Sequence, residues 1–331
     1  MREPFGVRLA GAMEAAGPLC VGIDPHPALL DAWGLPRTAA GLERFALSVV
    51  EAAAGLAAAV KPQVALFEAY GSAGFAVLER VLRESREAGV LSIADAKRGD
   101  IGSTMAAYAQ AWLADDSSLA ADAVTLSPYL GVESLRPALD LARQTGRGTF
   151  VLALTSNPEG AAVQHVGGTS SVAGAVLDAV AHENAVAREN AAADDVVAHD
   201  GAAGSSTQDD AEASPQVGAR GAVQEGLANR DGIVTSPARS TLGSCGVVVG
   251  ATVGDALERL EIDLGTLGGP VLAPGYGAQG AGAEDLAAVF QHVRPAVLAN
   301  SSRGILAHGP DVSALRDAIR ASSEELSRSL R

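Results

Sequence analysis

The stretch LSIADAKRGDIGST, residues 91–104, reads as an apolar strand that ends in charged residues and leads into a helix. Asp95 and Lys97 are two positions apart, so the alternation of side chains along a strand places both on the same side. Lys97 and Lys61 are the only lysines in the chain, and every other one of its 24 basic residues is an arginine. We therefore expect Lys97 to have a role that arginine does not fill.

Seven further apolar runs resemble this strand, and longer helix-like segments separate them. All eight predicted strands together are residues 18–24, 58–63, 91–97, 122–127, 149–155, 245–251, 270–274 and 296–301. Near-continuous apolar strands that alternate with helices indicate a parallel sheet covered by helices. Eight such units predict a (β/α)8 TIM barrel. A doubly wound open sheet is the alternative, although the first loop lacks the GxGxxG fingerprint of its dinucleotide-binding form.

The spacing of the strands has one exception, between the fifth and the sixth. The excess length falls at about residues 185–240, which contain no Phe, Trp or Tyr and carry nine acidic residues against four basic ones. Such a segment cannot bury enough apolar surface to offset the entropy that it loses on ordering. We expect a disordered or loosely helical insertion, inert rather than regulatory, within a single barrel domain that spans residues 1–331.

The composition argues against several classes of protein. The 331 residues are 48% apolar but only 4% aromatic, and the formal net charge is −15. An acidic chain argues against nonspecific binding to nucleic acid or to anionic membranes, which requires a basic face. The N-terminal residues lack the apolar core of a signal peptide, and no run approaches the ~18 apolar residues of a membrane span. We expect a soluble, cytoplasmic protein.

No set of residues has the spacing of a metal site. Cys20 and Cys245 lie in separate apolar runs, which predicts buried thiols rather than a disulfide or a CxxC metal site. The six histidines are scattered, without HxH or HExxH spacing. We expect neither a metal nor a cofactor.

Polar residues recur where the predicted strands end. They are Asp24 after the first strand, Lys61 near the end of the second, Asp95 and Lys97 at the end of the third, and Ser156 after the fifth. The active site of a (β/α)8 barrel lies at the C-terminal ends of its strands. One buried charge there could belong to a structural ion pair, but several at one rim predict a functional site.

The residues that follow Lys97 extend this pattern. Asp100 is expected to open the next helix, with Thr104 four residues later on the same helix face. An acid at a helix start could also serve only to complement the helix dipole. That local role would explain Asp100, but it would not explain a lysine between two carboxylates.

A second cluster of motifs follows the last two strands, where barrels of this kind usually bind phosphate. The segments are LAPGYGAQGAGAEDL (272–286) and LANSSRGIL (298–306). Glycines in the first segment would let backbone N–H groups approach an oxyanion. Gln279 could donate a side-chain hydrogen bond, and Arg303 offers a planar charged group for phosphate oxygens. Together they predict a phosphate site.

Taken in order, seven motifs resemble those of the orotidine 5′-phosphate decarboxylase family, specifically its longer bacterial group. The motifs are VGIDPHP, VKPQVALFEAYGSAG, DAKRGDIGST, TLSPYLG, LTSNPEG, APGYGAQG and NSSRGI. They extend along nearly the whole chain apart from residues 185–240. The DxKxxD pattern alone is shared with related phosphosugar decarboxylases, whereas the ordered set is specific.

The resemblance implies a carboxy-lyase that converts orotidine 5′-monophosphate (OMP) to uridine 5′-monophosphate (UMP) and CO2 in pyrimidine biosynthesis. It also implies that the enzyme needs no cofactor and is a homodimer. Lys97 would protonate C6 of the pyrimidine as CO2 leaves. Lys61, Asp95, Lys97 and Asp100 would form an alternating charge network, with Asp100 supplied by the neighbouring subunit.

The resemblance also implies the residues that bind the substrate. They are Asp24, Lys61 and the neighbouring subunit's Thr104 at the ribose, Ser156 at the pyrimidine edge, Pro274 in the pocket wall, and Gln279 and Arg303 at the 5′-phosphate. Ser302 is a further substrate-binding residue.

This chemistry gives a reason for a lysine at position 97. Loss of CO2 leaves a carbanion that needs both electrostatic stabilisation and a proton, and an ammonium group supplies both. An arginine does not readily donate its proton because its pKa is too high. The flanking carboxylates favour the charged ammonium. Asp95 could also disfavour the substrate carboxylate, but preorganised stabilisation of the transition state is the explanation that we favour.

Three alternatives remain open. A metal-dependent keto-sugar-phosphate decarboxylase of the same fold would need an acid at the end of the second strand to help hold Mg²⁺. That region carries Lys61 instead, and Glu68 lies seven residues further on. A Schiff-base lyase would need a neutral lysine at some stage, which two flanking aspartates oppose. A noncatalytic nucleotide-binding barrel would need the phosphate site but not the Asp–Lys–Asp array.

Overall fold

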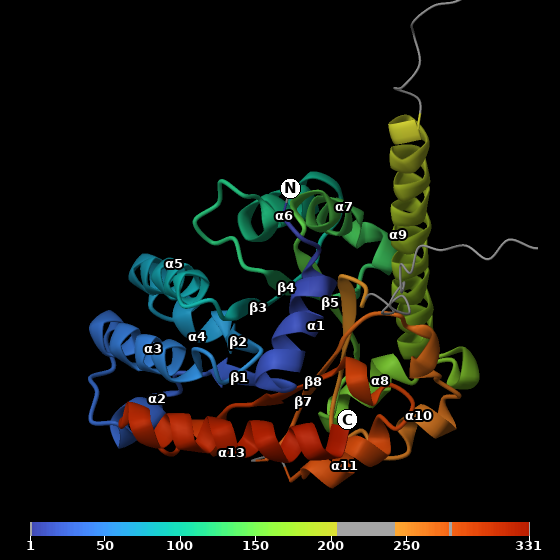
Figure 1. The fold of residues 1–331 in the computed structure, drawn as a ribbon. Helices are drawn as coiled ribbons and strands as arrows, with labels where there is room; N and C mark the ends of the chain where they lie inside the picture. Colours follow the sequence, from blue (N-terminus) through green and yellow to red (C-terminus); the bar gives the residue numbers. More distant parts are fainter. Residues whose placement is uncertain (1, 204–241, 278–279, 331) are drawn as a thin grey trace, which may run out of the picture.

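The computed structural model describes residues 2–203, 242–277 and 280–330, and its eight parallel strands form a closed barrel in chain order (Figure 1). The strands are β1 (Leu19–Ile23), β2 (Ala59–Pro62), β3 (Leu91–Arg98), β4 (Ala123–Leu126), β5 (Gly148–Leu154), β6 (Cys245–Val249), β7 (Val271–Pro274) and β8 (Val297–Ser301). Each coincides with one of the predicted apolar runs. The predicted (β/α)8 barrel is therefore confirmed, and the open sheet is excluded because β1 also pairs with β8.

Helices surround the barrel and connect its strands (Figure 1). The α-helices are α1 (Phe5–Ala16), α2 (Pro27–Ala32), α3 (Ala39–Ala53), α4 (Val64–Glu68), α5 (Gly71–Glu87), α6 (Gly102–Leu113), α7 (Arg136–Thr145), α8 (Ala161–Gln164), α9 (Val172–Ala203), α10 (Ala256–Arg259), α11 (Ala283–Val289), α12 (Arg303–Leu306) and α13 (Val312–Leu330). The short 3₁₀ helices are η1 (Val132–Leu135), η2 (Pro158–Gly160), η3 (Gly168–Ser170), η4 (Leu264–Thr266) and η5 (Arg294–Ala296). None of the helices in the described part of the chain has the length and apolar character needed to cross a membrane.

The N-terminal mouth of the barrel is filled by α1. Its apolar residues Phe5, Leu9 and Met13 are spaced by four positions, so they share one helix face, and all three are buried. They belong to one core cluster with residues from inside the barrel, including Cys20 and Phe150. The Phe5 and Phe150 rings meet edge to face, with their centroids 6.0 Å apart. This apolar plug leaves the opposite mouth, at the C-terminal ends of the strands, as the open one.

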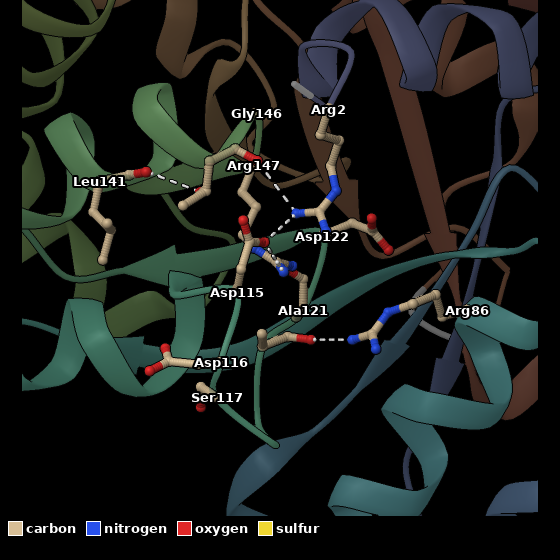
Figure 2. Close-up of polar contacts among 12 residues, drawn as sticks. Arg2, Arg86, Asp115, Asp116, Ser117, Ala121, Asp122, Leu141, Gly146 and Arg147 are labelled. Atoms are coloured by element: carbon tan, nitrogen blue, oxygen red, sulfur yellow. Dashed lines mark hydrogen bonds and ion pairs between the residues drawn. The ribbon is translucent and has the colours of Figure 1, made fainter.

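Polar contacts around the buried Arg147 tie together the loops at the N-terminal side of the barrel (Figure 2). The guanidinium of Arg147 donates to the Ala121 carbonyl and, at 2.9 Å, to Oδ1 of Asp115. Arg2 lies 3.0 Å from the same carboxylate oxygen. Burial lowers the pKa of Arg147, and the charge of Arg2 lowers it further. These ion pairs join the chain's N-terminus to the loops that precede β4 and β5.

The predicted insertion lies between β5 and β6, as expected from the strand spacing. Its first part, residues 185–203, continues α9, which projects past the barrel in Figure 1. Residues 204–240 of the predicted insertion lie outside the described residues. Cys20 and Cys245 are both free and buried, so the predicted buried thiols are confirmed.

Candidate active site

A cavity of about 570 Å³ lies at the C-terminal ends of the strands. Eight of the predicted site residues line it, and they are Asp24, Lys61, Asp95, Lys97, Ser156, Pro274, Ser302 and Arg303. They come from the ends of six different strands, which the barrel closure brings together. Gln279 lies outside the described residues.

Asp95 joins both lysines of the chain. Its Oδ2 accepts a hydrogen bond from Nζ of Lys61 at 2.8 Å, and its Oδ1 accepts one from Nζ of Lys97 at 2.5 Å. Lys61 and Asp95 are buried, whereas the side chain of Lys97 is 45% exposed. The site therefore consists of a buried ion pair and a second ammonium that the same carboxylate holds at the cavity wall.

The charges of this cluster stabilise one another. Burial alone would lower the pKa of Lys61, but the carboxylates of Asp95 and Asp24 outweigh it and raise that pKa above its ordinary value. Burial alone would raise the pKa of Asp95, but Lys61 and Lys97 outweigh it and hold that pKa well below its usual range. Both groups are therefore charged near neutral pH.

Two polar residues complete the cluster, and neither was among the residues predicted for the site. The buried hydroxyl of Thr125 donates to Oδ1 of Asp95 at 3.0 Å and accepts the backbone N–H of Lys97 at 2.9 Å. Turning the side-chain amide of Gln63 so that its nitrogen faces Asp95 gives two more hydrogen bonds, 2.9 Å to Oδ2 and 3.1 Å to the backbone oxygen. The sequence could have indicated both residues, because Thr125 is a polar residue within the apolar strand β4 and Gln63 is a polar residue directly after β2.

The opposite wall of the cavity joins β8 to β1. A Cβ on Gly22 would lie only 1.9 Å from Oγ of Ser302, so glycine is what allows Ser302 to approach β1. The Asn300 amide donates to that Oγ at 3.3 Å. Oδ1 of Asn300 and Oδ1 of Asp24 are buried without a hydrogen-bond partner among the described residues. Unpaired buried acceptors beside a cavity are suited to receive donors from a ligand.

Asp100 and Thr104 do not line this cavity. Helix α6 begins at Gly102, so the expectation that Asp100 opens the helix is wrong. Asp100 lies in the preceding loop because its carboxylate accepts the N–H of Ile101 at 2.8 Å, a local bond that competes with the helix. Thr104 is exposed on α6, and Ile101, three residues earlier in the chain, is a large apolar residue that is 61% exposed.

A metal-dependent keto-sugar-phosphate decarboxylase would need an acid near the end of β2 to help hold Mg²⁺. Glu68, which follows that strand, does not line the cavity. Its carboxylate forms an ion pair with Arg98 instead. No three of the His, Cys, Asp and Glu side chains within the described ranges form a group that could hold a metal ion.

Comparison with known proteins agrees with this geometry. Residues 17–240 match the model of the orotidine 5′-phosphate decarboxylase / HUMPS family. An orotidine 5′-phosphate decarboxylase from Streptomyces coelicolor is 50% identical over 96% of this chain and 94% of its own. A Streptomyces avermitilis structure provisionally given the same name is 47% identical, with a TM-score of 0.80 over 99% of this chain and 96% of its own. The structure of Leishmania donovani OMP decarboxylase is 27% identical, with a TM-score of 0.69 over 99% of both chains. The chain belongs to the orotidine 5′-phosphate decarboxylase family.

Proposed function

We propose that this protein is an orotidine 5′-phosphate decarboxylase, which converts OMP to UMP and CO2. The observation that carries the proposal is the arrangement around Asp95, where one carboxylate holds a buried lysine and a half-exposed lysine at a cavity rim. A nucleotide monophosphate can enter a cavity of about 570 Å³, which lies in the usual range for ligand pockets. Pyrimidine biosynthesis is the corresponding pathway.

The chemistry follows from the charges in the cavity. As the bond from C6 to the carboxylate breaks, its electron pair stays on C6, and CO2 leaves. The ammonium of Lys97 stabilises the developing charge and transfers its proton to C6, which completes UMP. Lys61 stays charged and keeps Asp95 ionised, so that Asp95 continues to orient Lys97. No residue in this sequence of steps has to form a covalent bond to the substrate.

The remaining substrate contacts are part of the same proposal. Asp24 and Lys61 bind the ribose and Ser156 binds the pyrimidine edge. Pro274 lines the pocket, Gln279 and Arg303 hold the 5′-phosphate, and Ser302 is a further substrate-binding residue. The position of Arg303 at the cavity rim, one residue after Ser302, supports this assignment. The reaction requires no metal and no cofactor in this scheme. A cytoplasmic location fits the two free cysteines, because thiols stay reduced there.

We further propose a homodimer in which Asp100 and Thr104 complete the neighbouring subunit's site. Both lie outside the cavity of their own chain, and the exposed apolar side chain of Ile101 lies between them in sequence. The test mixes inactive Lys97→Ala and Asp100→Ala subunits by co-refolding. Random pairing in a two-fold dimer leaves roughly a quarter of the sites intact, so activity should return. Activity that stays absent in the mixture, with dimers present, would place Asp100 in its own subunit's site.

The phosphate assignment predicts a substrate-dependent effect of Arg303→Ala. Loss of a charge-assisted contact costs ~1.5–3 kcal/mol, which is roughly a 10- to 150-fold loss in kcat/KM for OMP. Part of the loss should appear in kcat if phosphate binding also holds a closed arrangement. Orotidine, which lacks the phosphate, should be a poor substrate that the substitution barely affects. Equal loss with both substrates would give Arg303 a structural role instead.

The activity itself is tested by following UMP formation from OMP with the purified full chain, with and without EDTA. We expect equal turnover in both, because the proposed steps use only side chains of the protein. Turnover that EDTA abolishes and Mg²⁺ restores would support the metal-dependent decarboxylase. OMP that binds without being consumed would support a noncatalytic nucleotide-binding barrel.

A further inference from the structure

The end of β3 departs from regular strand geometry at Lys97. The register with β4 pairs Ala94 with Val124 and then Arg98 with Leu126, so two additional residues of β3 bulge out between these pairs. Within the bulge Lys97 has a φ of 48°, in the left-handed region that residues with a side chain rarely adopt. A conformation of this kind persists only where the surrounding structure enforces it.

Arg98 directly follows the strained residue and is held from two sides. Its guanidinium forms an ion pair with Glu68 at the end of α4. Its guanidinium carbon lies 5.6 Å from the centroid of the Tyr108 ring and 5.8 Å from that of the Trp112 ring, both on α6. These distances are within the range of cation–π attraction. The Arg98 side chain thus joins β3 to both neighbouring helices.

The backbone of Arg98 is fixed as well. Its carbonyl accepts the N–H of Ser127 at 2.8 Å, which restores the pairing with β4 after the bulge. Directly before Arg98, within the bulge, the N–H of Lys97 is bound to the Thr125 hydroxyl. Asp95, at the start of the bulge, forms a backbone bridge with Gln63, and Arg98 provides the anchor on the side of the helices.

We propose that Arg98 is a positioning residue for Lys97. By holding the end of β3 between α4 and α6, it keeps Lys97 in the left-handed conformation that directs its ammonium to Asp95 at the cavity wall. This inference rests on the proposed decarboxylase function, because it gives Lys97 the catalytic role. Arginine suits the position because a flat guanidinium can pair with a carboxylate and contact rings at once, whereas an ammonium is a point charge.

The experiment compares Arg98→Met with Arg316→Met. Arg316 is a half-buried arginine that donates to the carbonyls of Glu51, Ala52 and Ala54, away from the cavity, so its loss controls for a general loss of stability. Misplacement of a catalytic group by about an ångström can cost ~10²-fold in rate. We therefore expect kcat for OMP to fall 10- to 100-fold in Arg98→Met, with KM and the Kd for UMP changed less than about threefold. Arg316→Met should keep the wild-type kcat.

Lysine-selective ¹³C labelling gives a second readout that needs no turnover. The chain has two lysines, so the ε-carbon region of the spectrum should hold two signals. We expect Arg98→Met to shift the Lys97 signal and leave the Lys61 signal in place, and Arg316→Met to shift neither. This readout separates the two proposals, because a wild-type protein that fails to turn over OMP leaves the spectral prediction intact.

Either of two results would overturn the proposal. One is a folded Arg98→Met protein with wild-type kcat and an unshifted Lys97 signal. The other is a loss of UMP affinity as large as the loss of kcat, which would show a general collapse of the pocket. Should Arg98→Met not fold, Arg98→Lys provides the kinetic test, because its additional lysine would add a third signal to the spectrum. It keeps the charge beside Glu68 but not the flat contact with the rings, and it should lower kcat by a smaller factor in the same direction.

Discussion

Lys97→Ala should abolish decarboxylation of OMP while the protein stays folded. A positioned general acid contributes ~10²–10⁴-fold to a rate, and Lys97 also supplies electrostatic stabilisation, so we expect kcat to fall by at least ~10³-fold. The fold should survive because the Lys97 side chain is 45% exposed and Asp95 keeps its ion pair with Lys61. The measurement is kcat by UMP formation, alongside circular dichroism and the Tm.

Lys97→Arg is the matched variant, because it keeps the positive charge and changes the acidity. It should remain close to the alanine variant, since a guanidinium retains its proton. An arginine variant with a turnover near wild type would mean that charge alone is sufficient at position 97. Lys97 would then not be the proton donor.

Asp95→Asn should lose both activity and stability. The substitution leaves Lys61, which is 5% exposed, without its hydrogen-bonded counter-charge, and breaking a buried pair in this way costs ~3–5 kcal/mol. Activity should be lost because neither lysine keeps its charged acceptor. Urea unfolding near neutral pH measures the free-energy difference. The control is Asp317→Asn on α13, where an exposed ion pair with Arg320 should contribute less than ~1 kcal/mol.

The stability that Asp95 contributes should depend on pH in one direction. Burial opposes the charge of Asp95, but Lys61 and Lys97 outweigh it and lower its pKa in the folded state. Its contribution to stability is therefore complete above the ordinary carboxyl pKa of about 4 and is lost as the pH falls below that value. The difference in the free energy of unfolding between wild type and Asp95→Asn should become smaller as the pH is lowered from neutral to about pH 3. A free-energy difference that stays constant over this pH range would mean that the pKa of Asp95 is not lowered.

The strands and the rim residues could be predicted from the sequence because both signals are local. Eight apolar runs identify the strands, and polar residues at their ends identify the rim. Helix α1 was not predicted as an element, although its Phe5, Leu9 and Met13 have helical spacing. Its role depends on a contact with Phe150, far along the chain, which no local pattern encodes.

The geometry at Lys97 could not be predicted for the same reason. Alternation along a regular strand places Asp95 and Lys97 on one side, and they do meet, but through a bulge and a left-handed backbone. Both features depend on the register with β4. The contribution of Thr125 is likewise visible only once β3 and β4 lie side by side.

The role of Lys97 can be measured most directly by rebuilding its ammonium chemically. In Lys97→Cys the thiol should react with 2-bromoethylamine, forming a thioether and releasing bromide, which gives a side chain as long as lysine. Cys20 and Cys245 should not react in the folded protein, because burial raises the pKa of their thiols to about 12 and about 11. We expect kcat for OMP to rise by about 10²-fold or more after aminoethylation, and not after alkylation with iodoacetamide. A fully aminoethylated, folded enzyme with no more activity than the unmodified cysteine variant would contradict a role for the Lys97 ammonium as the proton donor.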